Sequence, residues 1–423
     1  MNNPQTVRNG DRLERILFLA VILFVLLAVF RSVLAPGRFL FTSDDNIGDL
    51  AMRKSLLPGG FLGGWNDGAL LGYSTVVSPG WTHMLLWLMP LRMFINWIHG
   101  LDLVLASLAL AAFLRRRDLS WPACAVAALT AFWVGSNFTL TYAGHIMKFG
   151  ILMWAAVYMW LLDRAVESGR PALAVLAGGA LGAMFLEQAD VALFFALVLG
   201  PYALVRLSQA AGASWRKWGG LLGPLLLSAG LIAFYPLWEN YRANVRGVAS
   251  MERENPAEKW AYVTQWSWPP EESIDFIAPG YMGWRSGEPE GPYWGRMGRS
   301  EGWEKTRSGF QNFKLENQYL GAIPIMLALA ALLGARAGSP RRMEVVFWGA
   351  AALVTLLLSF GKHFPLYAVF YQLPVINNIR NPNKFLQVFQ LAVAILAACG
   401  FDRVLSAGRE PDGSIKKSSA RFV

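Results

Sequence analysis

The feature that most constrains this chain is a series of apolar segments, each close to 20 residues long, separated by short polar connections. A helix of about 20 residues can cross the roughly 30 Å hydrocarbon layer of a bilayer. Ten such segments can be drawn, which predicts an all-α integral membrane protein with about ten transmembrane helices. The expected spans are residues 16–35, 98–114, 120–138, 147–163, 171–188, 190–206, 219–238, 318–335, 343–360 and 385–402.

Basic residues occur in every second connection, and this pattern predicts the orientation. Because Lys and Arg are enriched in cytoplasmic loops, residues 1–15 are expected to be a cytoplasmic N-terminus and residues 406–423 a polar cytoplasmic tail, with one transmembrane domain over residues 16–405. The outer side then receives two large loops, residues 36–97 and 239–317. The net charge of +10 is divided among small clusters, so nucleic acid is not an expected partner.

Each large outer loop has apolar features of its own. Residues 81–98 are apolar but contain Pro90 and Arg92, which favours an interfacial or re-entrant helix over a full crossing. In the long second loop, indole rings could stack on sugar rings or could anchor an amphipathic flap at the lipid interface. Those tryptophans are Trp260, Trp266, Trp268, Trp284, Trp294 and Trp303.

Three carboxylates follow the first apolar segment closely: Asp44, Asp45 and Asp49. Acids this close together need a cation, a hydrogen-bond donor or a raised pKa, so the group is a candidate for catalysis. If the protein uses a divalent cation, these carboxylates are the expected ligands, and Mg²⁺ or Mn²⁺ the expected ions. The competing interpretation is a capping box, in which Thr42 and Asp45 begin an amphipathic helix over residues 46–57.

A second set of polar residues lies at the outer ends of the middle spans. His145 could be a metal ligand or a proton carrier, and Lys148, three residues later, would share its helical face. Glu187, Gln188 and Asp190 interrupt two apolar segments. The alternatives are a structural histidine at the membrane edge and a solvated turn. Polar groups at span ends that face one compartment are functional candidates, so these five residues are assigned to substrate binding.

Two further cations, Arg380 and Lys384, precede the last span. Basic residues are depleted on the outer side of a membrane, so this pair indicates an anionic partner such as a phosphate. Snorkelling of the two side chains towards the interface is the alternative. The sequence contains no Walker-type phosphate loop, no HExxH and no GxSxG, which disfavours ATP-driven transport, zinc-protease chemistry and serine-hydrolase chemistry.

Four stretches of the chain carry a resemblance to a known family. They are Gly64-Trp65-Asn66 through Ser78-Pro79-Gly80, then Gly144-His145 with Lys148 and Trp154, then Leu161-Leu162-Asp163-Arg164 followed by Gln188, and finally Arg380 through Phe385 followed by Gly400 through Arg403. In this order and spacing they resemble the YfhO family of bacterial multi-pass membrane proteins, within the GT-C superfamily of glycosyltransferases.

The resemblance implies a GT-C-like fold and sugar transfer from a polyprenyl-phosphate donor to a cell-envelope lipid or polymer. It places the active face outside the bacterial cytoplasmic membrane, with Asp44 or Asp45 as base or metal ligand and Arg380 and Lys384 on the donor phosphate. Relatives continue into further spans, whereas this chain ends in a polar tail, so it would be a short or truncated member.

Two other classes remain open from the residues themselves. A transporter or flippase for a lipid-linked or anionic solute would place ionisable residues near mid-membrane, and the expected span centres are almost free of them. A non-catalytic subunit of envelope assembly would use the carboxylates only as helix caps.

Overall fold

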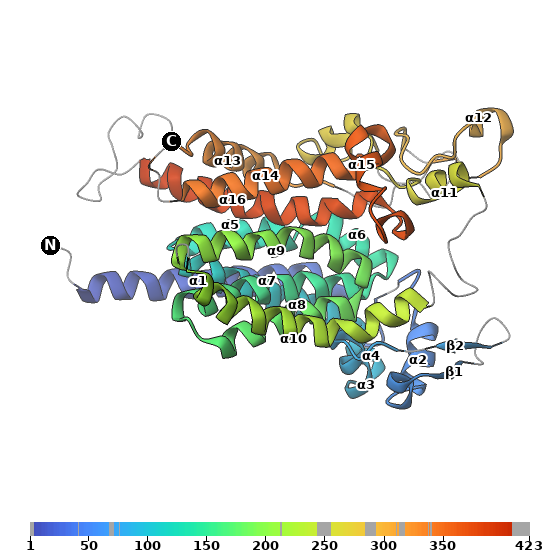
Figure 1. Ribbon diagram of the computed structural model, residues 1–423, viewed down its shortest axis with the longest axis horizontal. Coiled ribbons are helices and arrows are strands. Elements are labelled where there is room, and N and C mark those ends of the chain that lie inside the picture. Colours follow the sequence, from blue (N-terminus) through green and yellow to red (C-terminus); the bar gives the residue numbers. More distant parts are fainter. Residues whose placement is uncertain are drawn as a thin grey trace.

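The computed structural model describes residues 4–40, 42–66, 72–75, 77–211, 214–242, 255–283, 293–309, 311–312, 318–336, 338 and 341–407. Long helices lie side by side in a bundle (Figure 1). Helix α1 begins and helix α16 ends at one end of it. This end, called the basic end below, also carries Arg115 to Arg117, since Arg115 pairs with Asp11 of α1. The short elements α2, β1, β2, α11 and α12 lie at the opposite end, called the loop end.

The long helices coincide with the apolar segments of the sequence. They are α1 Pro4–Val29, α4 Leu91–Arg116, α5 Trp121–Phe132, α6 Gly135–Ala143, α7 Ile146–Ser168, α8 Pro171–Glu187, α9 Ala189–Ala211, α10 Trp215–Tyr241, α13 Ala322–Leu333, α14 Arg342–Ser359 and α16 Phe385–Ala407. Among the described residues, six helices are long and apolar enough to cross a membrane, and α5 with α6, bent by 43°, would make a seventh. Helices α8 and α13 are shorter, with 17 and 12 residues.

Apolar side chains face outward along the bundle. On α10, Leu226, Leu227, Leu231 and Phe234 are all more than 60% exposed. A continuous apolar surface of this kind is unfavourable in water and suits the hydrocarbon interior of a bilayer. The protein is therefore a membrane-embedded, mostly helical protein, as the hydrophobic pattern predicted.

Small residues let neighbouring helices approach closely. A Cβ added at Gly178 of α8 would lie 2.1 Å from the Leu225 carbonyl oxygen of α10, and one at Gly400 of α16 would lie 1.8 Å from the Leu327 carbonyl oxygen of α13. Helix association inside a bilayer depends on such close van der Waals packing because lipid chains are themselves apolar. These contacts fix α8 against α10 and α13 against α16.

Buried charges join four helices at the basic end. Asp163 of α7 is fully buried and accepts hydrogen bonds from Arg206 of α9, with Nε to Oδ1 at 2.9 Å. Arg117, at the end of α4, pairs with Glu344 of α14 at 2.5 Å. Each of these four charged side chains lies beside a partner of opposite sign, as the low dielectric of the interior requires.

The loop end is built from short elements in three loops. The first loop contains η1 Arg31–Leu34, α2 Ile47–Ser55, η2 Gly59–Leu62, an antiparallel hairpin of β1 Gly64–Asn66 and β2 Tyr73–Thr75, and α3 Trp81–Leu88. The second contains α11 Pro256–Val263, η4 Pro270–Phe276 and α12 Trp303–Thr306. The third contains η5 Gly361–His363, α15 Pro365–Phe370, η6 Ile376–Asn378 and η7 Pro382–Lys384.

The expected interfacial helix over residues 81–98 is two helices, and only the first of them is short. Helix α3 ends at Leu88, and Pro90 is the N-cap of α4, which begins at Leu91. Proline has a φ suited to a helix start but cannot continue a preceding helix. Residues 91–97, which were expected in the outer loop, thus form the first two turns of α4, a candidate membrane span.

The tryptophans of the second loop mostly pack inward. Trp268 is fully buried and stacks on Phe276, and Trp260 lies edge-on to Tyr371 with ring centroids 4.9 Å apart. Trp294 is 64% exposed, and Trp284 lies outside the described residues. Trp260 and Trp268 thus have a packing role that neither sequence interpretation included.

Candidate functional site

The loop that carries Asp44 and Asp45 lies against the turn between α6 and α7. The backbone N–H of Asp44 and the hydroxyl of Ser43 both donate to the carbonyl of Ala143, at 3.0 and 3.1 Å. Gly144 has a φ of +87°, and a Cβ there would lie 2.6 Å from the backbone nitrogen of Asp45. Glycine is therefore required at position 144 both for the turn and for the close approach of the loop.

Helix α2 is capped differently from the sequence prediction. Its N-cap is Asn46, whose Oδ1 accepts from the N–H groups of Gly48 and Asp49, while Asn46 Nδ2 donates to Asp49 Oδ2 at 2.8 Å. The Thr42 hydroxyl instead donates to the carbonyl of Asp45 at 2.6 Å. The expected Thr42–Asp45 capping box is wrong, because Asn46 is itself a preferred N-cap residue and stands directly before the first helical position.

The two neighbouring carboxylates have different environments. Asp45 is buried and pairs with Arg53 Nη1 at 2.8 Å. Burial raises the pKa of the Asp45 carboxyl, and Arg53 opposes this shift. The side chain of Asp44 is 68% exposed, with Oδ2 3.9 Å from His145 Nε2. Asp44 is thus the acid accessible to solvent, while Asp45 holds the loop to α2.

The three carboxylates do not converge on a cation site. Asp45 faces Arg53, Asp49 faces Asn46, and Asp44 faces His145. Within the described ranges, no group of three or more His, Cys, Asp or Glu side chains is placed to hold a metal ion. The expectation that Asp44, Asp45 and Asp49 would be the ligands of Mg²⁺ or Mn²⁺ does not fit this geometry, because two of the three are already paired.

Asp44 belongs to a group of five charged or ionisable side chains, called the charged cluster below: Asp44, His145, Lys148, Asp190 and Lys384. His145 is the N-cap residue of α7, and Lys148 lies buried in the first turn of that helix. Burial lowers the pKa of His145 to about 3, with further lowering by Lys148 and Lys384 and an opposing effect of Asp190. His145 is therefore a neutral imidazole at pH 7.

An ion pair between Lys384 and Asp190 completes the charged cluster. Asp190 lies in the first turn of α9, and Lys384 ends η7, directly before α16. The second loop of the loop end holds this segment in place, since the N–H of Asn381 donates to the Val263 carbonyl and that of Asn383 to the Trp266 carbonyl. The Trp-rich loop thus positions one of the two cations predicted to bind phosphate.

The other predicted cation has a separate partner. The guanidinium of Arg380 lies over the ring of Tyr262, 3.9 Å from its centroid. The Arg380 Nε atom is buried, with no hydrogen-bond partner in the described part of the chain. Arg380 thus contacts α11, whereas Lys384 contacts α9, so the two predicted phosphate-binding cations have separate partners.

Glu187 and Gln188 lie at the junction of α8 and α9, and Glu187 is the more deeply buried of the two. Glu187 is buried, and its Oε1 accepts from the backbone N–H of Thr82, at the start of α3, at 3.2 Å. A Cβ added at Gly80 or Gly150 would clash with its carboxylate. Glu187 therefore caps α3 from inside the bundle, and Gln188 is the half-buried C-cap of α8.

Two buried ionisable residues of α4 were not singled out from the sequence. Asp102 is fully buried and accepts from Trp81 Nε1 at 2.8 Å, while His99 is fully buried beside Phe149, with ring centroids 4.8 Å apart. Because α4 begins at Leu91, both lie near the middle of that helix, and not at the start of a span as the expected bounds 98–114 placed them. The available signal was the His99–Asp102 spacing of three residues, which places both on one face of a helix.

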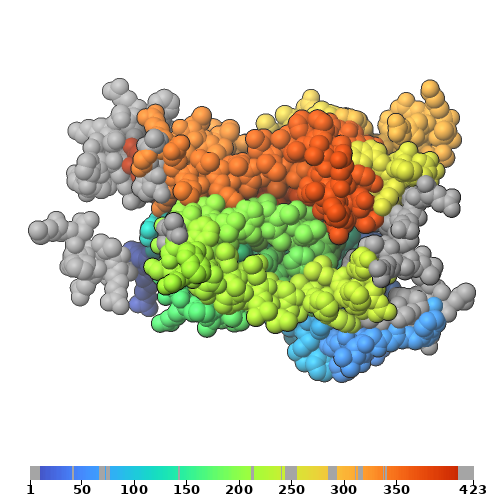
Figure 2. Space-filling model, in the orientation of Figure 1, coloured from blue at the N-terminus to red at the C-terminus, as the bar shows by residue number. Residues whose placement is uncertain are grey.

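An apolar groove of about 340 Å³ begins next to the Lys384–Asp190 pair and lies between α9 and the helices α14 to α16. In Figure 2 these elements meet along the border between the green and the orange to red segments. Phe385, the next residue after Lys384, stacks on Phe194, one turn after Asp190, with centroids 4.0 Å apart. The lining residues are Leu197, Val198, Val354, Thr355, Leu358, Leu366, Val369, Phe370, Leu373 and Phe385.

Comparison with known proteins gives no match to this chain, neither among protein-family models nor among curated proteins. The resemblance to the YfhO family thus stays a prediction from the quoted sequence stretches.

Proposed function

We propose that this protein is a membrane glycosyltransferase of the GT-C type, which moves a sugar from a polyprenyl-phosphate donor to a cell-envelope lipid or polymer. The observation that carries the proposal is the position of the charged cluster at the end of the apolar groove. A lipid-linked phosphate needs both parts together, namely cations for the phosphate and an apolar surface for the chain.

The proposed topology has ten spans in the bacterial cytoplasmic membrane, with the N-terminus in the cytoplasm and the charged cluster on the outer face. It is supported by the arginines of the basic end, since basic residues favour the cytoplasmic side, and by both large loops lying at the opposite end. Labelling of single cysteines introduced at Trp294 and at Arg164 tests it. A membrane-impermeant thiol reagent should reach only the first from outside intact cells.

In the proposed complex the prenyl chain occupies the groove and the phosphate lies at Lys384 and Lys148. Lys384 is held by Asp190 in the structure, so its ammonium is already oriented at the groove end. Two ammonium groups near one phosphate stabilise the negative charge that grows on it when the sugar leaves. Arg380 supports the segment through its contact with Tyr262.

Asp44 then acts as the general base. It takes the proton of an acceptor hydroxyl while that oxygen attacks the anomeric carbon. The bond between this carbon and the phosphate oxygen breaks, and its electron pair remains on the released polyprenyl phosphate. Neutral His145, 3.9 Å from Asp44, is placed to hydrogen-bond the acceptor, and Asp45 keeps the loop in position through Arg53.

The direct test is sugar transfer by the full-length protein in membranes, measured for wild type, Asp44→Asn and Asp45→Asn at equal expression. Loss of a general base lowers transfer by about 10²–10⁴-fold, so Asp44→Asn should be nearly inactive with unchanged thermal stability. Asp45→Asn should mainly lower stability, because it leaves Arg53 without its partner. Full transfer by Asp44→Asn would remove the catalytic assignment.

A second function has specific support in the buried ionisable residues of α4. Asp102 and His99 lie inside a candidate membrane span, and such residues mark ion or substrate pathways in transporters. A flippase for a lipid-linked or anionic solute would use them. Proteoliposomes separate the two functions: movement of a labelled lipid-linked sugar across the bilayer without transfer, lost in Asp102→Asn and kept in Asp44→Asn, would favour the flippase.

A further inference from the structure

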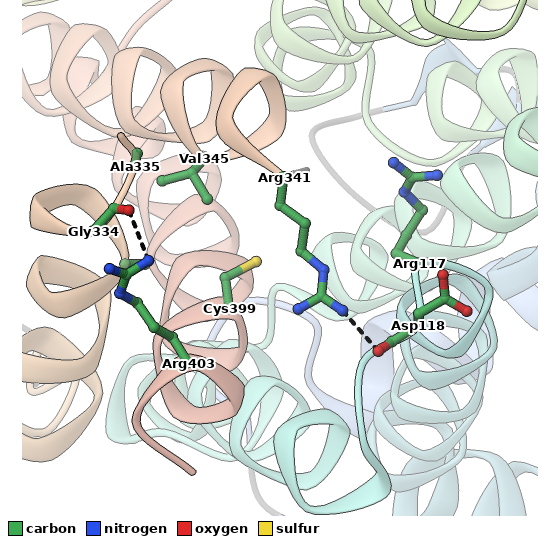
Figure 3. Close-up of a pocket in the computed structure, with 9 residues that line it drawn as sticks. Arg117, Asp118, Gly334, Ala335, Arg341, Val345, Cys399 and Arg403 are labelled. Carbon is green, nitrogen blue, oxygen red and sulfur yellow. Dashed lines mark hydrogen bonds between the residues drawn. The ribbon is translucent and has the colours of Figure 1, made fainter. Parts of the chain in front are cut away.

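A pocket of about 330 Å³ lies at the basic end, at the opposite end of the bundle from the charged cluster. It is bordered by the end of α4, the end of α13, the start of α14 and the last turns of α16 (Figure 3). No step of the proposed sugar transfer uses it. The residues that matter for its chemistry are Arg117, Asp118, Gly334, Arg341, Cys399 and Arg403.

Three guanidinium groups line this pocket, against one lining carboxylate, that of Asp118. Arg341 Nη2 donates to the backbone carbonyl of Asp118, and Arg403 Nη1 donates to the carbonyl of Gly334, each at 2.7 Å (Figure 3). A guanidinium has five N–H donors. These anchoring bonds orient the two side chains and leave further donors for a ligand in the pocket.

The acids outside the lining neutralise the arginines only in part. Arg117 has two acids beside it, Glu344 at 2.5 Å and Asp163 at 3.9 Å. An Asp402 oxygen lies 3.8 Å from Arg341 Nη1. The Nε atom of Arg117 is buried, with no hydrogen-bond partner in the described residues. Helix α14, which starts at Arg342 beside the pocket, has no side-chain cap, so the positive end of its dipole adds to the same field.

The backbone is shaped to admit Arg403. A Cβ added at Gly334 would lie 2.0 Å from Arg403 Nε. A side chain at position 334 would therefore occupy the space that the guanidinium of Arg403 fills. Apolar residues, among them Val345 and Cys399, form the rest of the wall. Leu333, next to Gly334, is 84% exposed, and Leu329, one turn earlier on α13, is 51% exposed. A cationic pocket thus adjoins an apolar surface that would face lipid.

We propose that this arginine pocket binds the phosphate of an anionic phospholipid headgroup, with the acyl chains along the exposed face of α13. Guanidinium groups bind phosphate oxygens through pairs of hydrogen bonds, and basic pockets between membrane helices suit anionic lipid headgroups. A free phosphate would use the same donors, but it would gain nothing from the apolar surface of Leu329 and Leu333.

The test is the thermal stability of the purified full-length protein in detergent, titrated with phosphatidylglycerol, phosphatidylcholine or inorganic phosphate. A ligand that binds only the folded state raises Tm, so phosphatidylglycerol should raise it by several degrees and the other two should not. An equal shift with phosphatidylcholine would overturn the proposal. An equal shift with inorganic phosphate would show a soluble-anion site in place of a lipid site.

Matched variants connect the shift to the pocket. Arg341→Gln with Arg403→Gln should weaken phosphatidylglycerol binding at least tenfold, whereas Arg216→Gln, an arginine of α10 outside the pocket, should leave it unchanged. Gly334→Ala displaces Arg403 without changing the charge, so it should also weaken phosphatidylglycerol binding. This variant provides the test if the double variant does not fold. Unchanged binding in Gly334→Ala and in the folded double variant would overturn the proposal.

Discussion

Lys384 and Asp190 form an ion pair across 194 residues of sequence, and this pair joins the start of α9 to the start of α16. Both side chains are largely shielded from water, with 12% and 26% of their surface exposed. An ion pair in such surroundings is costly to break from one side only, because the remaining charge has lost its partner.

Replacing the two partners separately and together should reveal their coupling. Lys384→Gln and Asp190→Asn should each lower the thermal stability, and the double variant should be more stable than the sum of the two changes predicts, by about 0.5–3 kcal/mol. Thermal unfolding in detergent measures this difference. Strict additivity of the two changes would show that the pair contributes nothing to the fold.

The same two substitutions should have opposite effects on donor binding. Lys384→Gln removes a cation from the proposed phosphate site and should lower sugar transfer about 10²–10³-fold. Asp190→Asn removes the competing carboxylate, so the protein should bind a prenyl phosphate more tightly than wild type does. Sugar transfer in membranes measures the first effect, and binding of prenyl phosphate to the purified protein measures the second. Weaker binding by Asp190→Asn would contradict this assignment.

Filling the apolar groove should impair use of long-chain donors. Val198→Trp places a larger side chain in the groove lining, so the KM for a long-chain polyprenyl donor should rise roughly tenfold with little change in kcat. A donor with a very short chain should be affected much less. Leu226→Trp on the exposed face of α10 is the control, and an equal rise in KM there would show a general effect of the added indole.

Acidification should destabilise the protein through its histidines. Burial lowers the pKa of His83 to about 4, with a contribution from Arg53. The unfolded chain, with a histidine pKa of about 6.5, then binds a proton that the folded protein does not. Stability should therefore fall as the pH decreases from about 6.5 to 4, by at most about 1.4 kcal/mol per pH unit for this residue.

Thermal unfolding between pH 7 and pH 5 measures this dependence. His83→Gln should reduce the slope without abolishing it, because His145 and His363 also have lowered pKa values, about 3 and about 4. An identical slope in wild type and His83→Gln would mean that His83 titrates in the folded protein as it does in the unfolded chain.

Two glycine substitutions should change stability in opposite directions. Gly178→Ala places a methyl group 2.1 Å from a backbone oxygen of α10 and should cost about 1–3 kcal/mol, because α8 and α10 must separate. Gly230→Ala, at a site of α10 with nothing within 4 Å, should stabilise by about 0.4–1 kcal/mol. Thermal unfolding compares them directly, and equal losses would argue against the close α8–α10 contact.

The hydrophobic pattern predicted the helices well because helix length and polarity are local properties. The helix starts were predicted less well. Asn46, and not Thr42, is the N-cap of α2, and Pro90 is the N-cap of α4, which begins earlier than the expected span. The candidate site was predicted in part. The residues of the charged cluster were all singled out, but the different environments of Asp44 and Asp45 could not be read from two adjacent identical side chains.

The sequence by itself determined a membrane-embedded helical protein and the set of polar residues at the ends of its helices, because these follow from hydrophobicity and spacing. Only the tertiary structure decided which of these residues meet. In the folded protein Lys384 pairs with Asp190, and Arg380 lies over the ring of Tyr262. Glu187 accepts a hydrogen bond at the start of α3, and three arginines line one pocket at the basic end. Such contacts depend on how distant helices pack, and packing is determined by shape and burial over the whole bundle.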